Sequence, residues 1–166
     1  MAALMEQKGS QDGQEYKRKM PPPPASATDS IKTTGILHFT IGVRDHLSAA
    51  KFYADVLGCR HLRSSRKFSF MECHGSYFVL ARMPNHVNPN GPDDESHHHA
   101  FLVDADEFDR AMEILRARDI RLVKYSDEGH RTFPGRHAYF HDADGNAIEI
   151  CTLYESDGDD ARDNPE

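Results

Sequence analysis

Hydrophobic and polar positions follow two different periods along the chain. In ILHFTIGV, residues 36–43, bulky and small or polar side chains alternate, which predicts a strand. From about residue 47 to 56 the apolar positions take helical spacing, and Gly58 gives a signal for the end of that helix. Two further strands are predicted at 67–73 and 76–82. The first part of the pattern is taken as strand, helix and then three strands, of which these two are assigned to residues.

The same pattern returns sixty residues later. SHHHAFLVD predicts a strand, and Phe108, Ala111, Met112 and Leu115 then form one stripe of a helix. Further strands are predicted at 120–123, 137–141 and 147–153. Because neither half could bury its sheet alone, we predict an α+β fold of two paired βαβββ modules, in which a curved eight-stranded cup has its helices on the outer face.

Strand parity predicts which side chains share the concave face. Leu37, Phe39, Ile41 and Val43 would pack under the first helix, which leaves His38 on the other side. The same reasoning turns His98 inward and places its neighbours His97 and His99 on the helix side. In the last strand it turns Glu149 inward. Two imidazoles and one carboxylate on one face are the ligands of a facial triad, which binds a divalent metal and leaves its other side open.

An isolated histidine in a strand is more often a hydrogen-bonded core or surface residue than a metal ligand. The agreement between the repeat and the parity favours the ligand interpretation for His38 and His98.

Composition divides the chain into three parts. Residues 1–33 are polar and contain four consecutive prolines, so we expect a disordered Pro-rich arm. Residues 155–166 hold six acidic residues and one arginine, which predicts an acidic tail and accounts for −5 of the net charge of −7. The single folded domain would span residues 34–154.

The composition also bears on partners and compartment. The sequence lacks a block of Lys and Arg of the kind that binds nucleic acid, which argues against such a partner. It also has no apolar run as long as a membrane span or the core of a signal peptide. We therefore expect a cytoplasmic protein. Its three cysteines, Cys59, Cys73 and Cys151, have no CxxC spacing, which favours reduced thiols over a disulfide framework or a structural zinc site.

Residues 35–154 resemble the vicinal oxygen chelate superfamily, which includes glyoxalase I, fosfomycin-resistance proteins and type I extradiol dioxygenases. The motifs that carry the resemblance are LHFTIGVRD, AAKFYADVLG, HHAFLVDA and YFHDADGNAIEI. The resemblance implies metal ligands at His38, His98 and Glu149. Ala143 departs from the family, whose turn usually has proline at this position.

The closest resemblance is to the extradiol ring-cleaving dioxygenases. Tyr139 lies nine residues after His130 and ten before Glu149, as in the signature of that branch. This implies Fe(II), with Mn(II) as the alternative, and a catechol-like aromatic substrate that is cleaved with O2. His74 would be the acid and base, with His86 as a second candidate. His130 would hydrogen-bond the bound oxygen or catecholate, Tyr139 would hold a ring oxygen near the metal, and the protein would be a homodimer.

Other members of the superfamily give alternatives. Thr40 and KYSDEG, residues 124–129, resemble a fosfomycin-resistance-like thiol transferase, although no arginine that could clamp a phosphonate follows Glu149 before the acidic tail. A glyoxalase-like lyase needs a fourth protein ligand, for which Glu72 is a weak candidate. A non-catalytic small-molecule-binding protein of the same fold also stays open.

Overall fold

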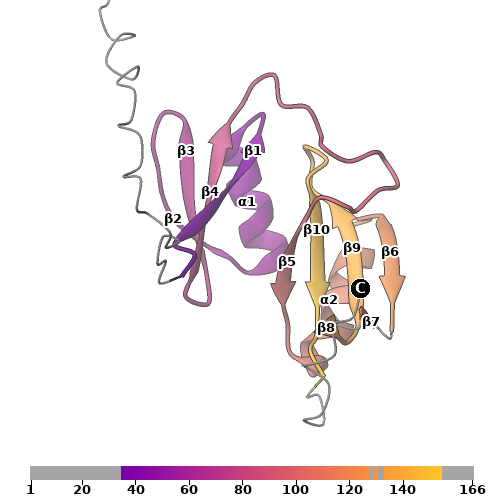
Figure 1. Cartoon of the computed structure of the whole chain (residues 1–166). Coiled ribbons are helices and arrows are strands. Elements are labelled where there is room, and N and C mark those ends of the chain that lie inside the picture. Colours follow the sequence, from indigo (N-terminus) through magenta and orange to yellow (C-terminus); the bar gives the residue numbers. More distant parts are fainter. Residues whose placement is uncertain (1–34, 128, 131–132, 155–166) are drawn as a thin grey trace, which may run out of the picture. The chain divides into compact units, whose positions relative to one another are not determined.

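The computed structural model describes residues 35–127, 129–130 and 133–154, with 129–130 described by their backbone alone. The predicted arm at 1–33 and the predicted tail at 155–166 lie outside these residues. The elements, shown in Figure 1, are β1 (His38–Val43), α1 (His46–Leu57), β2 (Arg60–Ser64), β3 (Phe68–Cys73), β4 (Ser76–Arg82), β5 (His98–Leu102), α2 (Ala105–Ala117), β6 (Leu122–Ser126), β7 (Gly129–His130), β8 (Phe133–Pro134), β9 (His137–His141) and β10 (Ala147–Cys151).

The eight longer strands form two four-stranded sheets with the same topology. The strand order is β1-β4-β3-β2 in module 1, residues 38–82, and β5-β10-β9-β6 in module 2, residues 98–151. In each module the first strand pairs in parallel with the last, and the other pairs are antiparallel. The predicted fold class of two paired βαβββ modules is thus confirmed. The short β7–β8 hairpin was not predicted, because two-residue strands are too short to show a period.

Helix α1 has clear signals at both ends. The Asp45 side chain accepts a hydrogen bond from the Leu47 N–H, and Gly58 ends the helix in the left-handed region with φ 67°. Its buried face includes Ala49, Ala50 and Tyr53. In α2, whose N-cap Asp104 makes no side-chain cap bond, Phe108 and Leu115 are buried as the predicted stripe requires.

Neither helix is long and apolar enough to cross a membrane, and no other helix occurs in the described part of the chain.

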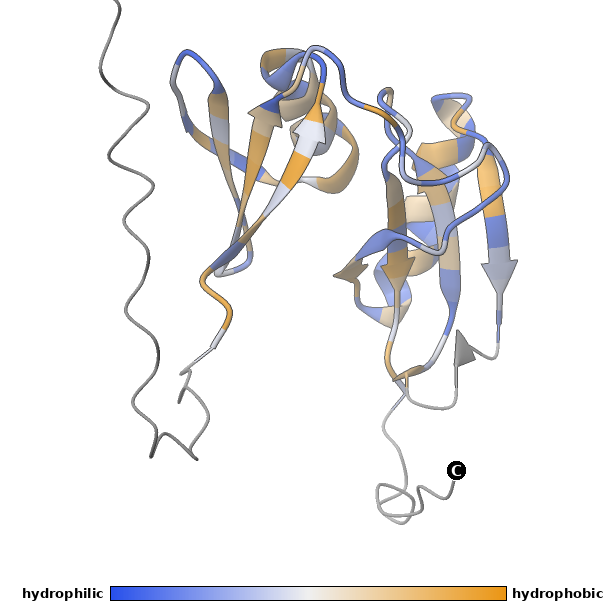
Figure 2. Ribbon diagram, turned by 45° about the horizontal axis from the view of Figure 1, so that its top comes forward, coloured by the Kyte–Doolittle hydropathy of each residue, from blue (hydrophilic) through white to orange (hydrophobic). Residues whose placement is uncertain are grey.

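The hydrophobic core follows the predicted parity except at Leu37, which precedes β1 and is 79% exposed. Ile41 and Val43 of β1, Phe101 of β5, and Ile148 and Ile150 of β10 are all buried. Figure 2 shows hydrophobic residues concentrated on strands and helices, with mostly hydrophilic connecting loops. Aromatic contacts continue this core from one module to the other: the ring of Phe101 lies 5.9 Å from that of Phe78 and 6.3 Å from that of Tyr53. Each sheet therefore leaves its opposite face free to carry polar groups.

A polar turn between β9 and β10 also links the two modules. The buried Asp142 carboxylate accepts hydrogen bonds from the Asp144 and Asn146 N–H groups, and its other oxygen accepts from the Tyr53 hydroxyl at 3.2 Å. The Asn146 side chain donates to the Gly42 carbonyl in β1. Gly145, with φ 84°, supplies the left-handed residue that the turn needs.

We predict that Asp142→Ala lowers the free energy of unfolding by about 2–4 kcal/mol, because it removes a charged acceptor and leaves the buried Tyr53 hydroxyl without this partner. Chemical denaturation would measure the change. Asp109→Ala is the matched control, since this exposed carboxylate makes only a surface ion pair with Arg136. Equal stability of the two variants would contradict the role given to Asp142.

Candidate metal centre

Glu149 is a buried carboxylate in the middle of module 2. It lies on β10, and only 5% of the residue is exposed. The strand registers set Ala100 of β5 beside it on one side and Tyr139 of β9 on the other. Because residues in register share a face of a sheet, the side chains that surround Glu149 come from three adjacent strands. A buried carboxylate needs compensating donors or a cation, and these strands supply hydrogen-bonding side chains.

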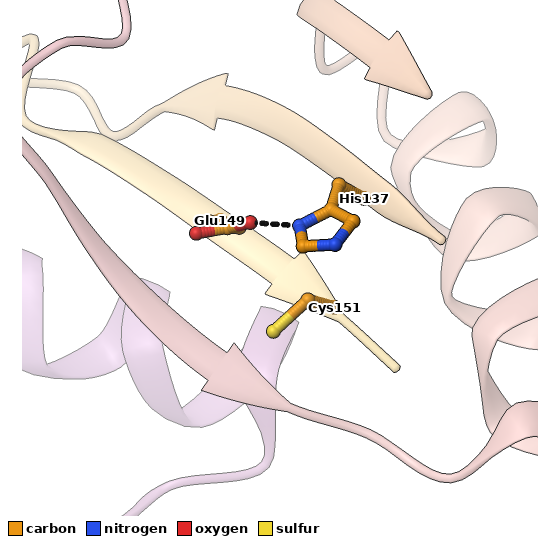
Figure 3. A group of neighbouring side chains, drawn as sticks. All are labelled: His137, Glu149 and Cys151. Carbon is orange, nitrogen blue, oxygen red and sulfur yellow. Dashed lines mark hydrogen bonds and ion pairs between the residues drawn. The ribbon is translucent and has the colours of Figure 1, made fainter. Parts of the chain in front are cut away.

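Three side chains contact the two oxygens of Glu149. The Tyr139 hydroxyl donates to Oε1 at 2.7 Å, and His137 Nδ1 bonds the same oxygen (Figure 3). On the other side, His98 Nε2 lies 3.0 Å from Oε2. Both oxygens of the carboxylate are therefore fixed in direction, and Oε2 faces an imidazole that is 34% exposed in its side chain.

The second nitrogen of His98 defines how this imidazole can act. His98 Nδ1 lies 2.7 Å from the Glu95 carbonyl, which only accepts, so Nδ1 carries the proton. A neutral ring then aims the lone pair of Nε2 at the carboxylate. These two acceptors repel each other unless a proton or a cation lies between them. A backbone carbonyl behind a histidine is also the usual arrangement around a metal-ligating imidazole.

The distance between these two atoms suits a divalent cation. Two ligand atoms that are each about 2.1 Å from one ion, at right angles, are about 3.0 Å apart. This agrees with the separation of His98 Nε2 and Glu149 Oε2. The pair thus offers one nitrogen and one oxygen ligand, and the exposed side of His98 leaves room for further ligands and a substrate.

A second group of possible ligands lies on the other side of the same carboxylate. Ligand atoms of His137, Glu149 and Cys151 all lie within 4.8 Å of one another. Figure 3 draws these three side chains. His137 Nε2 also donates to the Phe133 carbonyl at 2.9 Å, so both ring nitrogens already have partners. Burial and the nearby Glu149 raise the pKa of the Cys151 thiol to about 11, which disfavours the thiolate. This side fits a cation less well than the His98 side.

Tyr139 is held as a hydrogen-bond donor. Burial, followed by its hydrogen bond to Glu149, raises the pKa of the phenol well above its usual value. The group therefore stays protonated at neutral pH. Its ring lies edge-on to His98, with centroids 5.3 Å apart, so it also restricts the position of that imidazole.

The other predicted site residues belong to β1, β7, the β3–β4 turn and the loop after β4. His38 is exposed on β1, where it pairs with Tyr77, and it belongs to no three-residue ligand group among the described side chains. His74 is exposed at the tip of the β3–β4 turn with φ 44°. The backbone of His130 pairs with Phe133, but its side chain lies outside the described residues. His86 packs against Gly42, and its Nε2 is buried without a partner.

His137 was not predicted as a neighbour of Glu149. Alternation along HAYFH, residues 137–141, places His137 on the same face as Tyr139, and this pattern could have identified it. Its importance depends on the pairing of His137 with Cys151 across β9 and β10, which brings the ring beside the carboxylate.

The hollows found beside the Asp142–Asp144 turn include neither His98 nor Glu149 among their lining residues.

Comparisons with solved structures agree with the fold. A glyoxalase/dioxygenase from Nostoc punctiforme is 24% identical, with a TM-score of 0.62 over 78% of this chain and 100% of its own. The fosfomycin resistance protein FosX from Listeria monocytogenes is 19% identical, with a TM-score of 0.62 over 75% and 97% of the two chains. Lactoylglutathione lyase from Agrobacterium tumefaciens is 20% identical, with a TM-score of 0.57 over 72% and 94%.

These identities establish a shared fold and not a shared reaction. The family follows from the sequence, because residues 35–150, which are most of the chain, match the model of one protein family. The chain belongs to the Glyoxalase/Bleomycin resistance protein/Dioxygenase superfamily.

Proposed function

We propose that the protein is a divalent-metal-dependent enzyme that acts on a small molecule at Glu149. The observation that carries the proposal is the contact between His98 Nε2 and Glu149 Oε2 at 3.0 Å, while Nδ1 of the histidine is bound to the Glu95 carbonyl. When bound, a divalent ion would supply open positions for two neighbouring substrate oxygens and, if the ion is Fe(II), for O2. His98 and Glu149 would hold this ion.

The reaction proposed first is extradiol cleavage of a catechol-like substrate with O2. Tyr139 keeps its phenolic proton, which it donates to Glu149, and lies against His98; on substrate binding the hydroxyl would turn this proton from Glu149 to a substrate oxygen at the metal face. A histidine must accept a proton from the catechol and return one later, for which an imidazole suits near-neutral pH. His74 is the first candidate for this step, His86 is the second, and His130 would bond the bound oxygen or catecholate.

The second candidate is a fosfomycin-resistance-like reaction with Mn(II). It is favoured by structural likeness to FosX from Listeria monocytogenes, one form of which was solved with Mn(II) and a sulfate ion. Thr40 is exposed on β1, two residues after His38. Lys124 is exposed on β6, and its ammonium group donates to Glu95 at 2.6 Å, so this cation lies near the backbone segment that holds His98.

The exposed position of His38 leads us to include a second copy of the chain in the proposal. It is exposed on the inner face of module 1, and exposed apolar side chains occupy the inner faces of both sheets, with Tyr77 46% and Leu102 65% exposed. We propose a homodimer in which His38 of one copy completes the ligands His98 and Glu149 of another. Burial of these side chains would favour association.

Metal binding provides the first test. Glu149→Gln and His98→Ala should each weaken Mn(II) binding by more than about 100-fold, since loss of even a second-sphere partner costs 10–100-fold. Isothermal titration calorimetry would measure the affinity. His97→Ala and Glu72→Gln are matched controls, because His97 is the exposed neighbour and Glu72 lies in module 1 with Arg60. Unchanged affinity in both test variants would exclude this site.

Activity provides the second test. The protein would be loaded with Fe(II) without oxygen, mixed with a panel of catechols and then exposed to O2. A yellow ring-fission product is expected, and Glu149→Gln should abolish it while His97→Ala should not. Absence of product with every catechol, together with thiol transfer to fosfomycin, would replace the dioxygenase by the second candidate. Metal binding without either reaction would contradict both.

Mixing of variants tests the shared site. His38→Ala and Glu149→Gln homodimers should each bind Mn(II) weakly. If each site takes His38 from one copy and His98 with Glu149 from the other, a heterodimer of the two variants contains one intact site and one site with both changes. Exchange of subunits should then restore tight binding to one of the two sites in each heterodimer. A monomer by light scattering, or no recovery after proven exchange, would contradict this arrangement.

A further inference from the structure

Cys59 and Cys73 lie opposite each other at one end of module 1. Strands β2 and β3 are antiparallel, with Arg60 paired to Glu72, and the same register continued by one residue sets Cys59 opposite Cys73. Opposite residues in such a pair have Cα atoms about 4.5–5.5 Å apart, which lies within the range that a disulfide spans. Both side chains contact the hydrophobic core beneath α1.

The surroundings hold this register firmly. On the other face of the strands, Arg60 Nε bonds Glu72 Oε2 at 3.0 Å, and Glu72 Oε1 accepts from the Gly75 N–H at 2.7 Å. The N–H of Cys59 donates to the Tyr53 carbonyl, immediately after the helix ends at Gly58. The backbone on both sides of the thiol pair is thus fixed by hydrogen bonds.

The two thiols differ in reactivity. Cys59 is 3% exposed, whereas Cys73 is only half-buried. A hydrogen bond from the Cys59 thiol, with a smaller contribution from nearby His74, lowers the pKa of Cys73 to about 7. The same hydrogen bond, together with burial, raises the pKa of Cys59. Cys73 thus has the features of an attacking thiolate, and Cys59 those of its protonated partner.

We propose that Cys73 and Cys59 form a peroxide-reactive modification site. The Cys73 thiolate attacks a hydroperoxide, breaks its O–O bond and takes up the OH group as a sulfenic acid, while the rest of the peroxide leaves as hydroxide or alkoxide. The Cys59 sulfur then attacks the Cys73 sulfur, its proton joins the departing OH group, and one water and one disulfide result. The peroxide is the two-electron oxidant.

This disulfide would join the start of β2 to the end of β3 and adjoin the turn that carries His74. Cys151 provides an internal comparison. It lies in module 2, is 8% exposed, and its thiol donates to the Phe101 carbonyl. The proposal is independent of the proposed enzymatic function, since it involves neither the metal ligands nor a substrate.

Peptide mapping of the whole protein tests the site. Reduced protein would be treated with hydrogen peroxide, its remaining thiols would be blocked with N-ethylmaleimide, and it would be digested without reductant. Trypsin cuts after Arg60 and Lys67, so the two cysteines fall on separate peptides, 52–60 and 68–82. We expect these peptides to be joined, with two of the three thiols lost and Cys151 fully blocked by the reagent.

Variants separate the two steps. In Cys59→Ser, dimedone should label Cys73 as a sulfenic acid after peroxide treatment. In Cys73→Ser, Cys59 should stay reduced under the same conditions. The map of the unaltered protein decides the question even if a variant fails to fold. Three free thiols after excess peroxide, a disulfide that includes Cys151, or a disulfide between two copies would overturn the proposal.

Discussion

The Asp142 carboxylate holds the turn on which the rest of module 2 depends. One of its oxygens accepts from the backbone of the turn, and the other accepts from Tyr53 in module 1. The turn sets the register in which β9 pairs with β10, and in this register Glu149 lies opposite Tyr139. A slip of one residue would turn Glu149 toward the core and Ile148 or Ile150 toward the metal face. A structural turn thus determines the position of the proposed chemistry.

Glu149 shows how a buried charge can be stabilised without being neutralised completely. Tyr139 and His137 satisfy Oε1, while Oε2 faces an imidazole whose other nitrogen is already committed to the Glu95 carbonyl. The first oxygen is therefore supported by protein donors, and the second is directed toward the exposed side. This asymmetry separates the part of the carboxylate that gives rigidity from the part that can bind an ion.

The two modules use the same topology for different chemistry. In module 2 the face away from the core carries the candidate metal ligands. In module 1 the corresponding β1 residue, His38, is exposed, and the reactive feature is instead the thiol pair on the core side of β2 and β3. The repeat therefore supplies a scaffold, and the side chains at equivalent positions decide what each half contributes.

Most of the architecture follows from the sequence alone. Alternation in β1, the capped α1 ended by Gly58, and the repeat after sixty residues predicted both modules, and parity predicted that Ile148 and Ile150 are buried while Glu149 lies on the other face. The β7–β8 hairpin was missed because two-residue strands leave no period. Parity is a property of one strand, so the sequence could determine which face a residue occupies.

Which strands become neighbours is decided only by tertiary structure. Pairing of β10 with β5 and β9 brings His98, Tyr139 and His137 to one carboxylate, although residues up to 51 positions apart are involved. The sequence also indicated the face of His38, and the meeting of this side chain with Glu149 stays a prediction. The sequence determined the faces and the types of ligand. Long-range strand pairing and side-chain hydrogen bonds decided which of them meet, because these contacts have no local signal along the chain.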